Sequence, residues 1–294
     1  MSYPPDESVS ELIRGLKSPL AATRAKAART LARLGPTGAE VFNLLLGLSN
    51  DAEQGVREAA VQGLAGFGTH ALPALVKLLP HSCKYVRRNA VWGLAKLGPE
   101  ARPALPHLLP VLKDPDPRTA TAAAQAVGAM GRAAADAVTS LAEAMRGTNV
   151  VLCRMAAKAL SQIGLPALPT LVTHLKHHDP FVRGEAAVAL GWMGPAAAAA
   201  VPHLLALLAS QCATRTPPPA AWADGGSNAV TPLSAAAPAP PPDEGAVVQV
   251  IQALGRIGPA AGEAEESLAE LWHDPREGVR SAVVMAVRGI RGEG

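Results

Sequence analysis

Apolar residues recur along this chain with a long period. Three stretches, residues 56–68, 86–98 and 182–194, superpose without a gap, and each begins with Val-Arg and closes with Gly. Residues 23–35 and 279–290 fit the same frame, and weaker copies end at Gly131, Gly164 and Gly258. Counted from the arginine as position zero, apolar residues stand at offsets 3, 4, 7 and 10. This spacing lies on one face of a helix, so each copy predicts an amphipathic helix.

The copies define a repeat. The arginine position falls at residues 24, 57, 87, 120, 153, 183, 247 and 280, so the step is 30 or 33 residues with one double step of 64. A second amphipathic segment precedes each copy, for example at residues 71–79, 104–112, 168–175 and 201–208. Asp-Pro turns start the later helix, and a left-handed Gly followed by Pro is expected to end it. The pattern predicts eight helix pairs, with the first helix near residues 7–17.

The pattern Asp-x-x-x-Val-Arg-x-x-Ala-Ala-x-x-Leu-x-x-Leu/Ile-Gly resembles HEAT repeats. The short period is similar to the subtype named for phycobilisome (PBS) lyases. The resemblance covers nearly the whole chain and implies an all-α protein, a right-handed α-solenoid of about eight HEAT-like pairs in an armadillo-like superhelix. It implies little about function, because HEAT arrays serve many tasks.

The double step coincides with a change in composition. Residues 211–243 are rich in Pro and Ala and show no helical period. We interpret them as a low-complexity insertion within the seventh helix pair, and residues 1–294 as a single solenoid. Such an insertion is either a tolerated spacer or part of a binding edge.

Composition narrows the setting. Of 294 residues 49% are hydrophobic but only 3% are aromatic, so the core is expected to consist of Leu, Val, Ile and Ala. Three widely spaced cysteines cannot all pair, which favours a reducing, cytoplasmic location. We expect no export signal and no membrane-spanning segment. The net charge of +3 is too small to argue for nucleic acid by itself.

The recurring arginines are best interpreted as structural. They stand at one position of the repeat, close to an acidic turn, and a planar guanidinium suits repeated contacts with carboxylates and carbonyls. We predict that they tie each later helix to adjacent turns. The five arginines are Arg24, Arg57, Arg87, Arg183 and Arg280.

No motif for catalysis is found. The sequence has no GxSxG, no GxxxxGK[ST] and no GxGxxG after a predicted strand. His174, His177 and His178 form its densest group of metal-ligand residues, but they close a predicted helix, and a solvated helix end is the simpler interpretation. Metal-dependent HEAT hydroxylases carry His-Glu pairs, and none of the eight histidines here precedes a Glu. We therefore expect no enzyme activity, no metal and no cofactor.

The later helices of the pairs are expected to line the concave side of the solenoid. Their residues at offsets 1, 2, 5 and 9 should be exposed there, which gives a basic groove with two tryptophans. Exposed Trp among Arg and Lys suits the binding of an acidic or amphipathic peptide. The predicted partner-binding residues are Arg88, Trp92, Lys96, Arg154, Lys158, Glu185 and Trp192.

Three functions remain open at this level. A non-catalytic scaffold for protein–protein interaction fits the predicted groove best. Resemblance to the lyase subtype implies an accessory or chaperone-like subunit of a phycobiliprotein-lyase system. Nucleic-acid binding is the third, and the small net charge argues against it.

Overall fold

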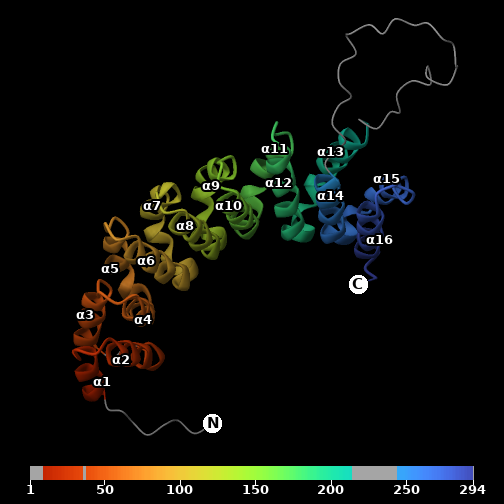
Figure 1. The fold of residues 1–294 in the computed structure, drawn as a ribbon. Helices are drawn as coiled ribbons and strands as arrows, with labels where there is room; N and C mark the ends of the chain where they lie inside the picture. Colours follow the sequence, from red (N-terminus) through yellow and green to blue (C-terminus); the bar gives the residue numbers. More distant parts are fainter. Residues whose placement is uncertain (1–8, 36–37, 214–243, 294) are drawn as a thin grey trace, which may run out of the picture. The chain divides into compact units, whose positions relative to one another are not determined.

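The computed structural model describes residues 9–35, 38–213 and 244–293 (Figure 1). These residues contain sixteen α-helices and no β-strand. The helices follow one another as eight pairs, in each of which a first helix precedes a second, usually longer, helix. The predicted fold class, an all-α solenoid, is confirmed.

The helix bounds are as follows. The first helices are α1 (Val9–Leu16), α3 (Ala39–Leu48), α5 (Leu72–Leu78), α7 (Leu105–Leu108), α9 (Val138–Met145), α11 (Leu168–His174), α13 (Val201–Ala213) and α15 (Ala264–Ala269). The second helices are α2 (Ala21–Leu34), α4 (Gln54–Ala65), α6 (Lys84–Leu97), α8 (Pro117–Ala129), α10 (Val150–Ile163), α12 (Pro180–Met193), α14 (Glu244–Ile257) and α16 (Glu277–Arg291). Short 3-10 turns join successive pairs or extend a first helix, at Gly68–Ala71, Gly98–Ala104, Pro110–Lys113, Gly131–Ala137, Leu165–Ala167, Gly194–Ala200 and Gly258–Ala261.

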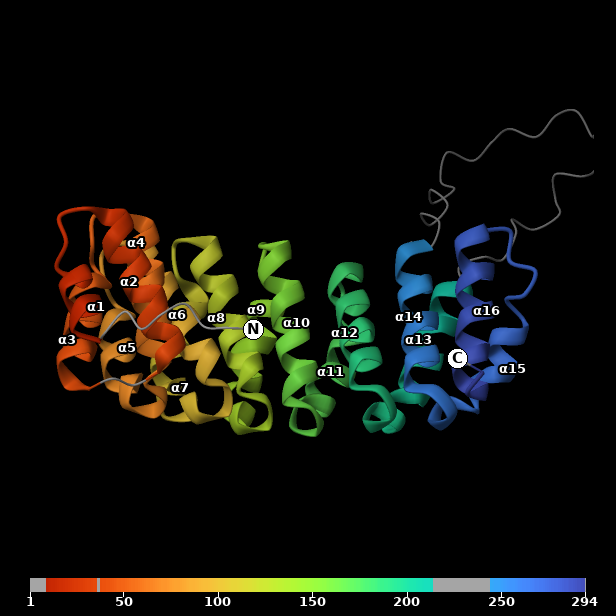
Figure 2. The ribbon, with the colours of Figure 1, turned by 90° about the horizontal axis from the view of Figure 1, so that it is seen from below.

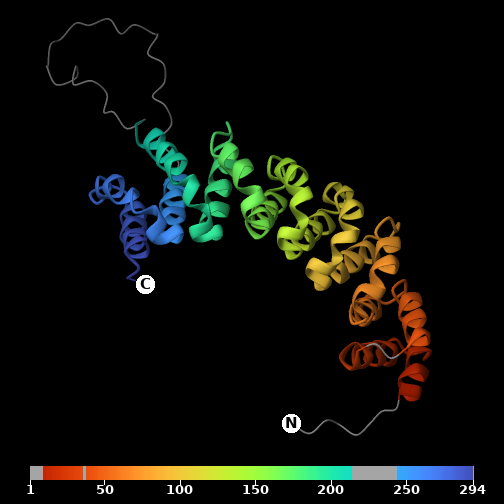
Figure 3. The same cartoon turned by 180° about the vertical axis from the view of Figure 1, so that it is seen from behind.

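The chain divides into two compact units, Met1–Ala167 and Leu168–Gly294, here called unit 1 and unit 2. In unit 1 the second helices pack side by side in the order α2, α4, α6, α8, α10, and Figure 2 looks onto this row. The first helices form the other layer of unit 1. In unit 2, α14 packs against both α12 and α16 (Figure 3). Buried Leu, Val, Ile and Ala residues make up most of the core of each unit, as the composition predicts.

The predicted insertion is only partly described. Residues 211–213 continue α13 instead of belonging to an irregular segment, so the predicted start is three residues too early. Residues 214–243 lie outside the described residues. They connect α13 to α14, the two helices of the seventh pair.

The glycines that end the second helices differ in detail from the prediction. Gly98 and Gly194 have φ of 56° and 59°, but their ψ angles of −130° and −140° are extended instead of left-handed helical. Both precede a proline, whose ring disfavours the helical range of ψ for the residue before it. Only glycine adopts this combination of positive φ and extended ψ readily, so the turn depends on glycine here.

Neighbouring second helices approach each other closely through small residues. A Cβ added at Gly191 would stand 2.9 Å from the Cα of Ala253, and one at Gly255 would stand 2.6 Å from the Cα of Ala286. In both pairs the glycine is at offset 8 of its helix and the alanine at offset 6 of the next. Backbone contact at this distance leaves no room for a larger side chain.

One stretch, Pro180–Cys212, is long and apolar enough by length and composition to cross a membrane. It comprises α12, a 3-10 turn and α13, and the chain turns between them at Gly194. Both helices pack against α14 within unit 2. About a third of the apolar window, 33%, is buried within the structure.

We predict that Gly255→Ala lowers the free energy of unfolding by about 1–3 kcal/mol, because the new methyl group would overlap the backbone of α16. The control is Gly47→Ala in α3, where an added Cβ meets nothing within 4 Å. That variant should be neutral or slightly more stable, because alanine favours a helix. Urea unfolding followed by circular dichroism measures both. Equal stability of the two variants would contradict the close packing.

Candidate functional site

Each of the five predicted structural arginines binds the turn before its own helix. Nη1 of Arg57 donates to the carbonyls of Asp51 and Ala52 at 2.6 and 2.7 Å. In the other four arginines Nη1 likewise donates to the carbonyls six and five positions earlier, at 2.7–2.9 Å. These four arginines are Arg24, Arg87, Arg183 and Arg280. The guanidinium thus satisfies two carbonyls that the turn leaves without a backbone partner.

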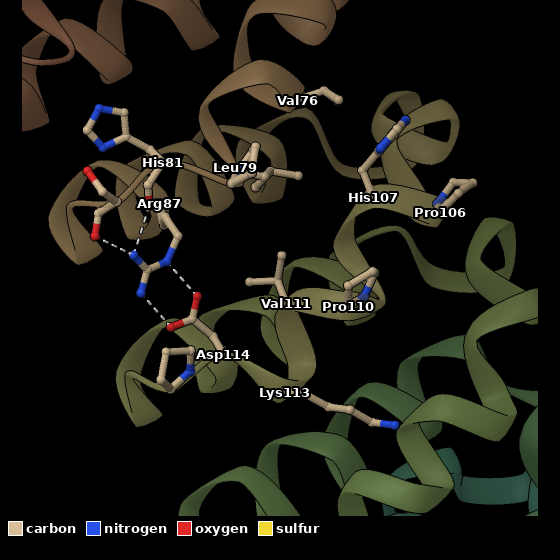
Figure 4. A pocket seen from close by; sticks show the side chains of 13 residues that line it. Val76, Leu79, His81, Arg87, Pro106, His107, Pro110, Val111, Lys113 and Asp114 are labelled. Atoms are coloured by element: carbon tan, nitrogen blue, oxygen red, sulfur yellow. Dashed lines mark hydrogen bonds and ion pairs between the residues drawn. The ribbon is translucent and has the colours of Figure 1, made fainter.

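Two of these arginines also reach the next turn. Arg24 makes a two-pronged ion pair with Asp51 at 2.8 and 2.9 Å, and Arg87 does the same with Asp114 at 2.6 and 2.8 Å (Figure 4). Both pairs are mostly buried. The side chains of Asp51 and Asp114 also accept a backbone N–H two residues on, which shapes the turn.

Other residues replace the aspartate in other turns. Nδ1 of His81 accepts the N–H of Cys83 at 3.0 Å, and Nδ1 of His177 accepts that of Asp179 at 3.1 Å. Histidine can shape the turn in this way but offers no carboxylate to the arginine before it. Accordingly, Arg57 lies over the ring of Tyr85, with its Cζ 5.4 Å from the centroid.

The ion pairs lower the pKa of the turn carboxyls. At Asp51 the hydrogen bond from Arg24 is the main cause. At Asp114 burial favours the protonated acid, but hydrogen bonds from Arg87 and from the backbone outweigh it. At Asp116 burial is likewise outweighed, by Thr119 and Arg88, and the pKa is lowered to about 2. The structure therefore requires ionised turn carboxylates.

We predict that Asp51→Asn lowers the urea midpoint of unfolding, because it leaves Arg24 without its carboxylate. Asparagine can still shape the turn, so the loss isolates the ion pair. Glu40→Gln is the control. Glu40 pairs with Lys17 at 3.2 Å, and both side chains are well exposed. This variant should change stability by less than about 1 kcal/mol. Similar losses in urea unfolding would show that burial of the Arg24 pair is unimportant.

We also predict loss of stability in acid. The pKa values of Asp51 and Asp114 are lower in the folded chain than in the unfolded chain, where an Asp has a pKa of about 3.9. Such a carboxyl stabilises the fold fully only at a pH above that unfolded pKa. This contribution disappears as the pH falls through the folded pKa values toward about 2. Urea midpoints measured between about pH 6 and pH 2 should fall most steeply below about pH 4. The double variant Asp51→Asn/Asp114→Asn should show a flatter profile, and an unchanged slope would contradict the assignment.

A basic hollow lies on the face of the second helices in unit 1. Its volume is about 680 Å³, and its lining residues are Lys26, Arg29, Thr30, Ala32 and Arg33 of α2, Gln62 of α4, and Trp92 and Lys96 of α6. Four of these residues are cations and none is acidic. The Trp92 side chain is exposed, and Nζ of Lys96 lies 5.0 Å from its ring centroid. Within the part of the chain that the structure describes, Arg29 and Arg33 have no ion-pair partner.

The predicted partner-binding residues are only partly brought together. Trp92 and Lys96 line the basic hollow, whereas Arg88 is half-buried and pairs with Asp116 at 2.9 Å. Arg154 and Lys158 are exposed on α10, in another part of unit 1. Trp192 is exposed on α12 and belongs to unit 2.

Glu185 does not reach the surface. Only 4% of it is exposed, so the prediction that it faces the groove is wrong. Glu185 is at offset 2, and Ala59 and Ala282 at the same offset are buried too. That offset lies on the flank along which second helices stack. Lys26, at offset 2 of α2, is exposed, and α2 is the first of the second helices among the described residues. The exposed offsets predicted from the sequence include that of Lys26, but none of the predicted partner-binding residues lies on α2.

The histidine group also differs from the prediction. His174 is buried, with Nδ1 2.8 Å from the carbonyl oxygen of Thr170, so it is not at a solvated helix end. Because α11 ends at His174, His178 lies beyond the helix and does not share its face. The described residues contain no group of three or more His, Cys, Asp or Glu residues that could hold a metal ion.

A second hollow, of about 640 Å³, lies between the third and fourth pairs (Figure 4). Val76, Leu79 and Val111 give it an apolar lining, and the Arg87–Asp114 ion pair closes one side. Its charged groups are therefore largely engaged with each other. This hollow offers less to a charged partner than the basic hollow does.

Comparison with known proteins agrees with the repeat. The model of HEAT repeats matches residues 72–152 and 139–216, and that of the PBS lyase HEAT-like repeat matches residues 56–79. Together the matches cover more than half of the chain. The chain belongs to the HEAT-repeat family. No curated protein matches its sequence.

Solved structures of other proteins share the fold. A mutant of Kap121p aligns with 96% of this HEAT-repeat chain, with a TM-score of 0.60 and 14% sequence identity. A structure of Kap121p bound to Nup53p also aligns with 96% of the chain, with a TM-score of 0.59 and 12% sequence identity. The chain spans 33% of Kap121p in both. A structure of the complex of CpcE and CpcF of phycocyanin lyase from Nostoc sp. PCC7120 has a TM-score of 0.46 and 22% sequence identity. The alignment covers 73% of this chain and 92% of the chain in that structure.

Proposed function

We propose that this HEAT-repeat protein is a non-catalytic scaffold that binds a partner protein on the second-helix face of unit 1. The observation that carries the proposal is the basic hollow, where four cations and an exposed tryptophan meet on one face. Exposed Trp and Arg are the residues most enriched at energetically important contacts between proteins. Kap121p, which shares the fold, has been solved bound to another protein, Nup53p.

A protein partner fits this face better than a nucleic acid. The cations gather in one hollow between α2 and α6 instead of forming a continuous stripe. On α4, between them, Glu58 is exposed and Gln62 is neutral. A polyanion would need cations spaced along its whole backbone. Three widely spaced cysteines favour a reducing compartment, and we propose a cytoplasmic location on that ground.

The match to the PBS lyase HEAT-like repeat supports a second candidate. A role as an accessory subunit in a lyase-type system is compatible with a scaffold, since both need a partner protein on the solenoid. The match covers residues 56–79, about one repeat. It therefore favours this role less strongly than the basic hollow favours a protein-binding scaffold.

Photo-crosslinking tests the proposal. A photoreactive amino acid in place of Gln62, within the basic hollow, should give a light-dependent adduct with a protein in nuclease-treated lysate of the source cells. The control is the same substitution at Lys77, which is exposed on the first helix α5. Mass spectrometry of the adducts identifies what was captured. Equal adducts at the two positions would contradict the choice of face, and adducts that form only in lysate without nuclease treatment would show a nucleic-acid surface instead.

A further inference from the structure

The geometry of the basic hollow points to a particular kind of partner. We infer that it recognises a short acidic segment of a protein in which a bulky apolar side chain follows closely spaced carboxylates. This inference rests on the proposed function and specifies the chemistry of the partner. It is argued from the arrangement of Arg29, Arg33, Trp92 and Lys96.

Arg29 and Arg33 fix the spacing of the carboxylates. They stand four residues apart on α2, so their side chains leave the same face about 5–6 Å apart. Alternate side chains of an extended peptide are separated by about 6–7 Å and lie on the same side. Two acidic residues in alternate positions can therefore meet the two guanidinium groups, each of which can bind a carboxylate through two N–H donors.

Nothing in the described part of the chain neutralises these two arginines. Two of the arginines that bind turns provide a contrast. The guanidinium groups of Arg24 and Arg87 each donate to two carbonyls and one carboxylate. Arg29 and Arg33 are exposed, and neither has such a partner within residues 9–35, 38–213 and 244–293. Pairing them with a ligand costs no ion pair seen among the described residues and relieves the repulsion between the two guanidinium groups.

Trp92 supplies the apolar contact. It is 36% exposed in a chain that has few aromatic residues, and the ammonium of Lys96 holds one part of its ring. The exposed part of the ring is available to a bulky apolar side chain. A carboxylate that binds Lys96 need not displace that ammonium from the ring. The hollow therefore combines charge recognition at α2 with apolar contact at α6.

Trp192 and Arg256 provide an internal comparison. Both stand at offset 9 of their helices, as Arg33 and Lys96 do, but the lining of the basic hollow includes neither. Arg33 and Arg256 are both exposed and both lie in the last turn of a second helix. Replacing either arginine by glutamate removes the same favourable interaction with the negative end of a helix dipole. A difference in peptide binding between the two variants therefore reports on the basic hollow.

The experiment measures binding of a short synthetic peptide in which two glutamates alternate with serines and a phenylalanine follows. Isothermal titration calorimetry with the full chain should detect binding. Arg33→Glu should weaken it by about tenfold or more, and Arg256→Glu should leave it within about twofold. Replacing the phenylalanine of the peptide by alanine should also weaken binding to the wild-type chain, and this change leaves the folded protein untouched. Circular dichroism checks that both variants are helical.

Two results would overturn the inference. If the wild-type chain does not bind the peptide, or if the two variants bind it equally, the hollow does not recognise acidic segments. Should the Gln62 crosslink still capture a protein, only the inference falls and the scaffold stands. If a single-stranded oligonucleotide of equal charge binds more tightly than the peptide, with a steep loss on adding salt, both proposals are wrong.

Discussion

The close approach of neighbouring second helices is the constraint on which the rest of this structure depends. Gly191 and Gly255 meet the backbone of the next helix, with Ala253 and Ala286 opposite them. Stacking at this distance covers both flanks of an inner second helix and its core side. What remains exposed is a narrow strip, and the position of that strip determines which side chains a partner can reach. Trp92 and Lys96 lie on it, whereas Glu185 lies on a flank and is buried.

The turns pose a separate problem, because stacked pairs bring many backbone carbonyls together at one edge. The recurring arginine solves it by donating to two carbonyls of its own turn. Where the arginine is replaced, the solution changes with it: the thiol of Cys153 donates to the carbonyl of Gly147, again six residues earlier, at 3.1 Å. A repeat position can therefore keep its hydrogen bond while its residue changes.

The sequence was sufficient to predict the fold because period, helical spacing and turn residues all agree, and each repeat carries the same information. It was less informative about the site, since exposure depends on what covers a helix from outside its own repeat. Lys26 and Glu185 share an offset, yet the first is exposed and the second buried. Likewise Arg88 and Lys96 are both basic residues of α6, but Asp116 engages only Arg88. Such differences depend on contacts between pairs, which the pattern of one repeat does not contain.

The ion pairs between turns are unevenly distributed among the junctions of unit 1. A buried carboxylate joins the first pair to the second through Arg24 and Asp51, and the third to the fourth through Arg87 and Asp114. Between the second and third pairs His81 replaces the aspartate, and Arg57 rests on Tyr85 instead. The basic hollow spans both the first and the second of these junctions, since its walls are α2 and α6. Of the two junctions that the hollow spans, the first carries the buried Arg24–Asp51 pair, whereas the second relies on apolar packing and the contact of Arg57 with Tyr85.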